Sequence, residues 1–267
     1  MVDVRAYLDR IGVAGTPSPD AAGLRALHRA HLLSVPFENL DIHLGRWIEL
    51  DPAALERKVV QQRRGGFCYE LNGAFSALLG ALGFEVRLLE ARVRKAAGRG
   101  FGPPFDHMLL RVRCPGEDGE WLADVGFGDC FLEPLRLEVG VDQDDPAGRF
   151  RIDEVDGELE LRRAAEGGRW DPEHRFGRHP HELASYRAMC RYHQTSPRSP
   201  FTQRRVCSLA TPTGRVTLRD DRLIVTDDGR RSERPVEGEA AWRQALEEHF
   251  GVRLPEGEQP AGGVRAG

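Results

Sequence analysis

The hydrophobic pattern of this chain of 267 residues changes from a helical to a strand-like period near Phe84, and that change constrains the fold more than any other feature. Before it, apolar residues recur at the spacing of an amphipathic helix. Beyond it they alternate with polar residues, as in HMLLRVRC (107–114), where Met108, Leu110 and Val112 face one way. Helices that are followed by strands and then by a mixed part predict an α+β fold rather than a doubly wound sheet.

Capping residues predict where the helices of the first third begin and end. Asp3 precedes the first apolar stripe, and Ser18 is expected to cap the second helix, with Pro19 in its first turn. Asp51 is the expected cap of the third helix, and Gly83 is a stop signal for the fourth. The helices predicted here are residues 4–12, 18–33, 51–66 and 68–83.

The rest of the chain is predicted to consist mostly of strands, including a hairpin that turns near Asp156-Gly157. A helical pattern over 179–193 and a last helix over 239–251 interrupt the strands, and residues 255–267 are predicted to be a disordered tail. Antiparallel strands before the last helix are indicated by turn signals at Thr213-Gly214, Asp220-Asp221 and Asp228-Gly229.

Composition excludes several classes of function. The formal charge of −4 gives no basic bias for binding nucleic acid, and no segment has the apolar length of a membrane span. The five cysteines are odd in number, widely spaced and without a CxxC pair, so neither a disulfide framework nor a zinc site is expected. Because the N-terminus shows no apolar signal region, the expected location is a reducing cytoplasm.

The segment RRGGFCYELNGAF (63–75) places Cys68 at the predicted first turn of a helix, just behind Gly65 and Gly66. Unpaired N–H groups and the helix dipole favour a thiolate there, which would lower the thiol pKa, and the glycines let the backbone approach a ligand closely. Free cysteine is also among the most buried residue types. On this segment alone, Cys68 is therefore either a nucleophile or a small core residue.

A nucleophilic cysteine needs a base and a group that orients the base. His107 begins one predicted strand and Asp124 lies near the end of the next, so neighbouring strands would bring the imidazole and the carboxylate together. Each residue also has an ordinary interpretation, as a solvated or core-bonded histidine and as a turn-forming acid before a glycine loop. No spacing rule decides between these interpretations.

Other motifs give weaker signals. VGFGD (125–129) lacks the third glycine of a dinucleotide-binding loop and the lysine of a P-loop. His28 and His31 lie one turn apart on a predicted helix, which favours a surface or core role. A predicted proline-containing loop carries three histidines that match no standard metal site, and no metal is expected; they are His174, His179 and His181.

Taken together, these segments resemble the arylamine N-acetyltransferase family. RRGGFCYELNGAF is similar to the family signature R-G-G-x-C-x-E-x-N, which is long and specific. Other segments look like the family's F-E-N-L segment, the segments that bear its His and Asp, and its S-T-x-P-x-S-x-F segment. They are VPFENLDIHLG (35–45), DHMLLRV (106–112), WLADVGFG (121–128) and TSPRSPF (195–201). The resemblance covers roughly residues 1 to 250, in order.

The resemblance implies a cysteine-protease-like triad of Cys68, His107 and Asp124. It also implies a fold of three parts. These are an N-terminal helical bundle that carries the nucleophile, a central antiparallel β-barrel that carries the histidine and the aspartate, and a C-terminal α/β lid. Their expected bounds are residues 1–83, 84–190 and 191–254.

The family reaction is ping-pong acetyl transfer from the co-substrate acetyl-CoA to an aromatic amine, hydrazine or hydrazide through an acetyl-cysteine. By the same resemblance, Gly126 and Gly128 would let coenzyme A pass close to the backbone. Arg64, Glu38 and Asn72 would be structural supports of the site. The acceptor pocket would be lined by Phe37, Val93, Phe127 and Phe201.

Some alternatives remain open. An amide synthase of the same fold, which transfers a polyketide acyl chain from a carrier protein to an aromatic amine, would need the same three residues. A cysteine hydrolase and a non-catalytic binding module are further alternatives. Asp129 and Cys130 follow the glycine loop, where an acid would disfavour a polyphosphate. Gln194-Thr195 departs from the family pattern, so Ser196 is assigned no role.

Overall fold

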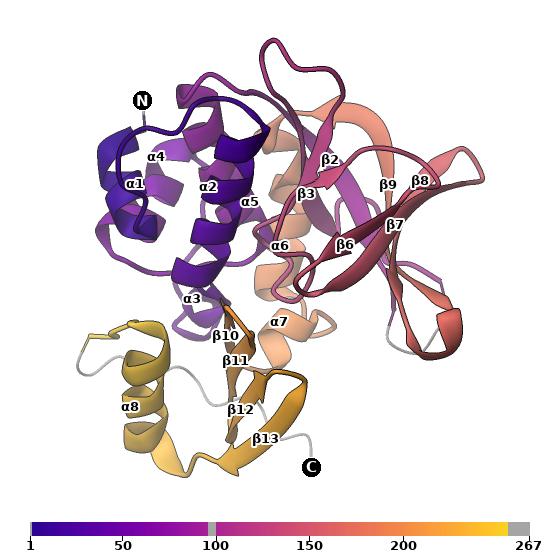
Figure 1. The fold of residues 1–267 in the computed structure, drawn as a ribbon. Coiled ribbons are helices and arrows are strands. Elements are labelled where there is room, and N and C mark those ends of the chain that lie inside the picture. The colour runs from indigo at the N-terminus through magenta and orange to yellow at the C-terminus, as the bar shows by residue number, and fades with distance from the viewer. Residues whose placement is uncertain (1, 96–99, 256–267) are drawn as a thin grey trace.

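Helices come first and strands follow, as the change of period predicts (Figure 1). The structure is a computed structural model and describes residues 2–95 and 100–255. The predicted disordered tail, 255–267, therefore lies outside the described residues except for its first position. The N-terminal part contains α1 Val4–Ile11, α2 Ala21–Ser34, α3 Leu40–His43, α4 Pro52–Glu56, the π-helical turn Arg57–Gln61 and α5 Cys68–Ala81.

Side-chain caps begin several of these helices. The carboxylates of Asp3 and Asp51 accept N–H groups in the first turns of α1 and α4, as predicted. The predicted cap of α2 was wrong, because Asp20 rather than Ser18 accepts the N–H of Gly23, at 2.7 Å. The chain at Ser18 folds back over this turn, so closely that a Cβ on Gly23 would lie 2.0 Å from the Ser18 carbonyl oxygen.

The central part is one antiparallel sheet in the order β5-β4-β3-β2-β9-β8-β7-β6, which curls into a nearly closed barrel. Its edges approach each other, because Gln143 of β6 bonds the backbone of Arg136 on β5, and Val139 bridges Ile152 of β7. The hairpin of β7 and β8 turns where predicted. The strands are β2 Glu85–Val93, β3 His107–Arg113, β4 Trp121–Ala123, β5 Leu135–Arg136, β6 Asp142–Asp145, β7 Gly148–Val155, β8 Glu158–Ala164 and β9 Trp170–His181.

The end of the barrel differs from the helix predicted over 179–193. β9 extends to His181, and α6, Arg187–Thr195, begins only after a 3-10 turn at Leu183–Tyr186. β9 pairs with β2 on one side and with β8 on the other, with a register shift on each side. Tertiary pairing therefore overrides the local sequence preference. The residues that obscure the strand pattern in this segment are Pro172, Gly177 and Pro180.

The C-terminal part is a five-stranded antiparallel sheet in the order β1-β10-β11-β12-β13. Its edge strand β1, Phe37–Glu38, comes from the N-terminal part and pairs with Ser208 and Cys207 of β10. In the described ranges, no helix combines the length and the apolarity that crossing a membrane requires. The remaining elements are α7 Pro200–Gln203, β10 Val206–Thr211, β11 Gly214–Arg219, β12 Arg222–Asp227, β13 Arg230–Pro235 and α8 Gly238–Phe250.

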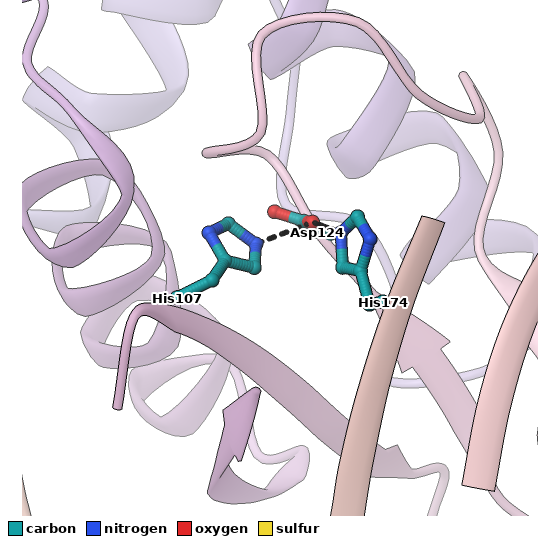
Figure 2. A group of neighbouring side chains, drawn as sticks. All are labelled: His107, Asp124 and His174. Atoms are coloured by element: carbon teal, nitrogen blue, oxygen red, sulfur yellow. Dashed lines mark hydrogen bonds and ion pairs between the residues drawn. The ribbon is translucent and has the colours of Figure 1, made fainter. Parts of the chain in front are cut away.

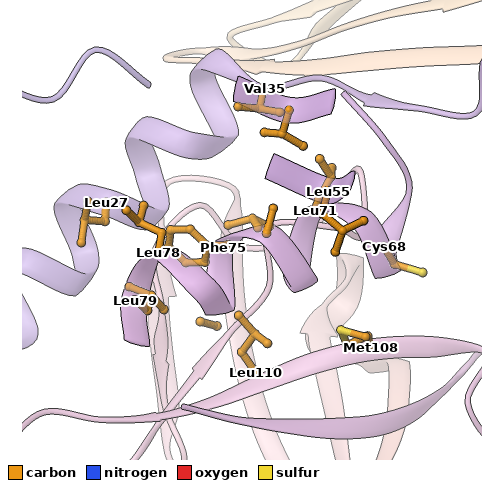
Figure 3. Close-up of a cluster of buried hydrophobic side chains, with 14 of the residues drawn as sticks. Leu27, Val35, Leu55, Cys68, Leu71, Phe75, Leu78, Leu79, Met108 and Leu110 are labelled. Atoms are coloured by element: carbon orange, nitrogen blue, oxygen red, sulfur yellow. The ribbon is translucent and has the colours of Figure 1, made fainter. Parts of the chain in front are cut away.

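Helix α5 lies between the helical part and the barrel and is buried along most of its length (Figure 3). Phe75 is fully buried, and its ring contacts those of His28 and His31 on α2. Met108 and Leu110 of β3 belong to the same hydrophobic cluster. The predicted α+β fold is confirmed, and the helix that begins at Cys68 is the element on which both parts pack.

We expect Phe75→Ala to lower the free energy of unfolding by about 3–5 kcal/mol, because it leaves a cavity between α5 and α2. Urea denaturation followed by far-UV circular dichroism measures this loss. Trp47 is 58% exposed and provides an aromatic control. Trp47→Ala should change the same free energy by no more than about 0.5 kcal/mol. Equal losses in the two variants would contradict the central position of α5.

Candidate active site

His107 and Asp124 meet at one end of the barrel strands, as their positions at strand ends predict (Figure 2). His107 begins β3, Asp124 directly follows β4, and these two strands are antiparallel. The start of one strand and the end of the other therefore lie side by side. The Nε2 atom of His107 lies 2.8 Å from Oδ2 of Asp124, and both side chains are at most 3% exposed.

The carboxylate of Asp124 is held in one orientation. Its Oδ1 accepts the Nδ2–H of Asn72 at 2.8 Å and the backbone N–H of Gly126 at 2.9 Å. Burial raises the pKa of Asp124, but the charge and hydrogen bond of His107 outweigh this effect and hold that pKa well below its usual range. The carboxylate is therefore ionised at neutral pH, and Asn72 supports it directly.

His28 holds the backbone at the same position. Its Nε2 accepts the N–H of Asp124 at 3.0 Å, and its Nδ1–H donates to the carbonyl of Leu132 at 2.9 Å. This pattern requires a neutral ring, and burial lowers the pKa of His28 accordingly. The sequence analysis favoured a surface or a core role for His28, and the core role is confirmed. The link to Asp124 carried no sequence signal, because it joins segments that are far apart in the chain.

Cys68 is the first residue of α5, where the sequence analysis placed it, and it is 3% exposed. The predicted lowering of its pKa is wrong for the thiol by itself. Burial, and then the charges of Asp124 and Asp106, raise the pKa of this thiol well above its ordinary value. The dipole of one helix start is a smaller effect than the lost hydration of a buried thiolate. A thiolate at Cys68 therefore depends on a neighbouring base.

The glycines near Cys68 serve close packing. Gly65 and Gly66 were predicted to let a ligand approach, but a Cβ on either would lie less than 3.0 Å from protein atoms. On Gly65 that Cβ would be 1.9 Å from the carbonyl oxygen of Pro36. A Cβ on Gly126 would lie 2.7 Å from the Cα of Cys68. The absence of these side chains lets the segment before β1 and the loop after β4 pack against the start of α5.

Five buried charged side chains gather near the first turn of α5; they are Glu38, Asp41, Lys58, Arg64 and Glu70. Arg64 contacts Glu38 at 2.7 Å and Asp41 at 2.9 Å. Lys58 contacts Asp41 at 2.7 Å and Glu70 at 2.6 Å. Glu70 also caps α5 by accepting a backbone N–H at 3.1 Å, and burial raises its pKa to about 7. The structure thus gives Arg64 and Glu38 a supporting position, whereas the sequence analysis missed the other three.

A cavity of about 450 Å³ opens beside the candidate triad. Cys68 and His107 line it, and Asp124 lies buried behind His107. The residues predicted for the acceptor pocket, together with one predicted for coenzyme A, also line it; they are Phe37, Val93, Phe127, Phe201 and Gly126. The sequence analysis missed Asp106 and His193, which line the cavity and whose carboxylate and Nε2 are 3.4 Å apart.

A second cavity, of about 320 Å³, contains Gly128 and shares two phenylalanines with the first. Asp129 also lines this cavity, and the Asp129 carboxylate lies 3.5 Å from Arg163 and 3.8 Å from Arg215. Cys130 points away into the barrel core and is 5% exposed. The basic residues that line this cavity are Arg215, Arg219 and Arg231.

The groups that could hold a metal ion differ from the three histidines singled out in the sequence. All three histidines are on β9 and not in a loop. His174 lies beside Asp124. His179 and His181 lie away from it and pack on each other, with ring centroids 5.1 Å apart. The ligand atoms of His107, Asp124 and His174 all lie within 4.8 Å of one another. A cation bound there would compete with the hydrogen bond between His107 and Asp124.

A cysteine and a histidine that line one cavity, with a carboxylate behind the histidine, are typical of enzymes that use a cysteine nucleophile. The family model described as N-acetyltransferase matches residues 20–259. The arylamine N-acetyltransferase of Mycolicibacterium smegmatis is 36% identical over 256 residues, which are 95% of this chain and 93% of that protein.

Solved structures agree with this match. The Mycobacterium smegmatis arylamine N-acetyltransferase has a TM-score of 0.89 at 35% identity, with 95% of this chain and 93% of that chain covered. The Mycobacterium marinum arylamine N-acetyltransferase in complex with CoA has a TM-score of 0.86 at 32% identity, with 94% and 93% covered. The chain therefore belongs to the arylamine N-acetyltransferase family, as its sequence resemblance predicted, and it is an acyltransferase.

We expect Lys58→Met to lower the free energy of unfolding by about 3–5 kcal/mol, because Asp41 and Glu70 would lose the cation that they share. The only other lysine, Lys95, is exposed, so Lys95→Met is a matched control with an expected change of at most about 0.5 kcal/mol. Chemical denaturation of both variants measures the difference. A Lys58→Met protein that unfolds at the wild-type denaturant concentration would show that the charged group does not stabilise the fold.

Proposed function

We propose that this enzyme transfers the acetyl group of acetyl-CoA to an arylamine, arylhydrazine or hydrazide by a ping-pong mechanism, through an acetyl group on Cys68. The observation that carries the proposal is the shared cavity. Cys68 and His107 line the same space, and Asp124 orients His107 from behind. The names of the relatives support both the acetyl transfer and the class of acceptor.

In this mechanism His107 is the base. Its Nε2 is bonded to Asp124, which leaves Nδ1, the nitrogen that points away from the carboxylate in Figure 2, to accept the proton of Cys68. Because burial raises the pKa of the thiol, the thiolate forms at neutral pH only by this transfer. The negative charge of Asp124 stabilises the imidazolium that results.

The thiolate of Cys68 then attacks the carbonyl carbon of the thioester, whose oxygen becomes an oxyanion. The first N–H groups of an α-helix have no partner within the helix, so those at the start of α5 can donate to this oxygen. The bond between the carbonyl carbon and the sulfur of coenzyme A breaks. The departing sulfur takes the proton from His107, and the acetyl group stays on Cys68.

The acceptor completes the cycle. An aromatic amine is weakly basic, so it is neutral at pH 7, and it fits a cavity whose walls include the rings of Phe37, Phe127 and Phe201. The amine nitrogen attacks the acetyl carbon while His107 takes one of its protons. The bond to Cys68 breaks, the amide leaves, and the imidazolium and thiolate are restored. Formation of an amide from a thioester is downhill, which gives the reaction its direction.

We assign coenzyme A to the second cavity and to the passage past Gly126 and Gly128. Guanidinium groups bind phosphate oxygens well, and the arginines of β11 and β13 supply them. An unpaired carboxylate at Asp129 would repel a polyphosphate, but Arg163 and Arg215 lie close enough to offset its charge. The Mycobacterium marinum relative, whose structure is a complex with CoA, supports coenzyme A as the partner.

Incubation with acetyl-CoA should place one acetyl group on the tryptic peptide that contains Cys68, as read by mass spectrometry. Cys68→Ser should abolish this adduct. Cys190, another buried free cysteine, is the matched control, and Cys190→Ser should keep the adduct. Wild-type protein without the adduct, or a Cys68→Ser protein that retains it, would overturn the proposed mechanism.

The acceptor step separates the proposal from the other activities. An aromatic amine or a hydrazine should discharge acetyl-Cys68 at a rate that rises with its concentration. Discharge by water at a rate that does not depend on the amine concentration would instead indicate a cysteine hydrolase. Loading from an acyl carrier protein but not from acetyl-CoA would indicate an amide synthase.

We expect His107→Asn to slow alkylation of Cys68 by iodoacetamide at pH 7 at least about tenfold, because a buried thiol without a base stays protonated. A raised thiol pKa means that thiolate appears only at alkaline pH, so the rate in this variant should climb as pH rises. His181, which does not line the cavity, is the control, and His181→Asn should keep the wild-type profile. Unchanged alkylation in His107→Asn would argue against the ion pair.

A further inference from the structure

His174 is a buried imidazole that the proposed mechanism does not use. It pairs with Val93 of β2 on one side and with Leu161 of β8 on the other, and it is completely buried. Among the described residues, neither of its ring nitrogens has a hydrogen-bond partner. Buried polar groups are nearly always bonded, so an unpaired imidazole at this place points to a function.

His174 is packed directly against His107 and Asp124 of the candidate triad (Figure 2). Its Nε2 lies 3.6 Å from Oδ2 of Asp124, and its ring centroid lies 5.0 Å from that of His107, with the ring planes at 87°. The ring of Phe127 contacts both imidazoles, with centroids 4.1 Å from His174 and 5.3 Å from His107. Strand pairing and this aromatic contact leave His174 little freedom to turn away from Asp124.

The carboxylate of Asp124 has one acceptor position for His174. Oδ1 already accepts from Asn72 and Gly126, whereas Oδ2 accepts only from His107 among the described residues. A carboxylate oxygen can accept two hydrogen bonds. Burial lowers the pKa of His174, so its ring is neutral and can donate an N–H without adding a second positive charge beside His107.

We propose that His174 is a positioning residue, whose Nε2–H closes onto Oδ2 of Asp124 when the acetyl donor fills the cavity and so limits how strongly Asp124 holds the proton of His107. This inference rests on the proposed function, because it assigns His174 a task in the same site. The contact of 3.6 Å is longer than a hydrogen bond, and catalytic hydrogen bonds commonly shorten when substrate binds.

Loss of His174 should stabilise the imidazolium form of His107. Without its N–H, Oδ2 would be a stronger acceptor for His107, and the imidazolium would persist to higher pH. The proton that Cys68 and His107 share would then lie more often on His107, so the ion pair would be more populated at neutral pH, while the free base that the amine step requires would appear only at higher pH. Loss of His174 should therefore speed alkylation of Cys68 at neutral pH and move the pH profile of the amine step upward, a combination that a purely structural role would not give.

Other titratable groups act on this centre, and they are the same in wild type and in every variant below. A difference in pH dependence can therefore be assigned to His174. These groups are Cys68 and Tyr69 of α5, His28 of α2, Asp106 before β3, Cys130 after the glycine loop and Glu173 of β9.

The test compares a variant that lacks the N–H with one that keeps it. His174→Phe preserves the ring, and it should lower kcat/KM for the amine roughly tenfold, the effect of one hydrogen bond to a charged group. It should also move the acidic limb of that pH profile up by about half a unit or more. His174→Gln retains a donor, and it should stay within about threefold of wild type with an unmoved limb.

His31 is the matched control for replacement of a buried histidine. It is completely buried and bonds the hydroxyl of Tyr7 rather than Asp124. His31→Phe should reduce thermal stability without changing the alkylation rate or the pH profile of the amine step, and circular dichroism shows whether each variant is folded. Profiles of His174→Phe that match wild type, or shifts equally large in His174→Gln, would overturn the inference.

Alkylation of Cys68 by iodoacetamide separates this inference from the proposed function, because it needs no acetyl-CoA. In His174→Phe alkylation at neutral pH should be faster than in wild type. If that increase is present and wild type forms no acetyl-Cys68, the proposed function fails while the role of His174 stands. If acetyl-Cys68 forms and the alkylation rate does not rise, the role of His174 alone is overturned.

Discussion

The rest of the site depends on the hydrogen bonds that the buried carboxylate of Asp124 accepts. It accepts hydrogen bonds from Asn72 of α5, His107 of β3 and Gly126 of its own loop, and its backbone N–H donates to His28 of α2. An ionised carboxylate is costly to bury unless such donors surround it. The helical part and the barrel must therefore meet in one arrangement for this charge to be satisfied.

The start of α5 also lies close to a second anionic group, in which Glu38, Asp41 and Glu70 share two cations. Burial and the charges of Asp124 and Asp106 make a thiolate at Cys68 unfavourable unless a proton acceptor is beside it. The reactivity of Cys68 is thus conditional on His107. A thiol that is buried and protonated until its base is in place is also poorly exposed to adventitious oxidation.

Local signals in the sequence predicted much of this. The period change predicted the order of helices and strands, Cys68 was placed at a helix start, and the strand ends brought His107 to Asp124. Contacts between distant segments carried no such signal. His28 gave no hint of its bond to Asp124, and His174 was misplaced in a loop because prolines and a glycine obscure its strand. The thiol pKa was mispredicted because burial cannot be read from a helix start.

The strand β1 has a consequence for the order in which the enzyme is completed. Phe37 forms a wall of the cavity beside Cys68, yet its strand is an edge of the sheet whose other strands begin at Val206. During synthesis the catalytic group could assemble from the helices and the barrel, but that wall would have no sheet to join until the last quarter of the chain emerged. Pairing β1 with β10 closes a long loop of chain, which costs conformational entropy and slows this step of folding. The wall that Phe37 forms is therefore completed only after β10 has been made.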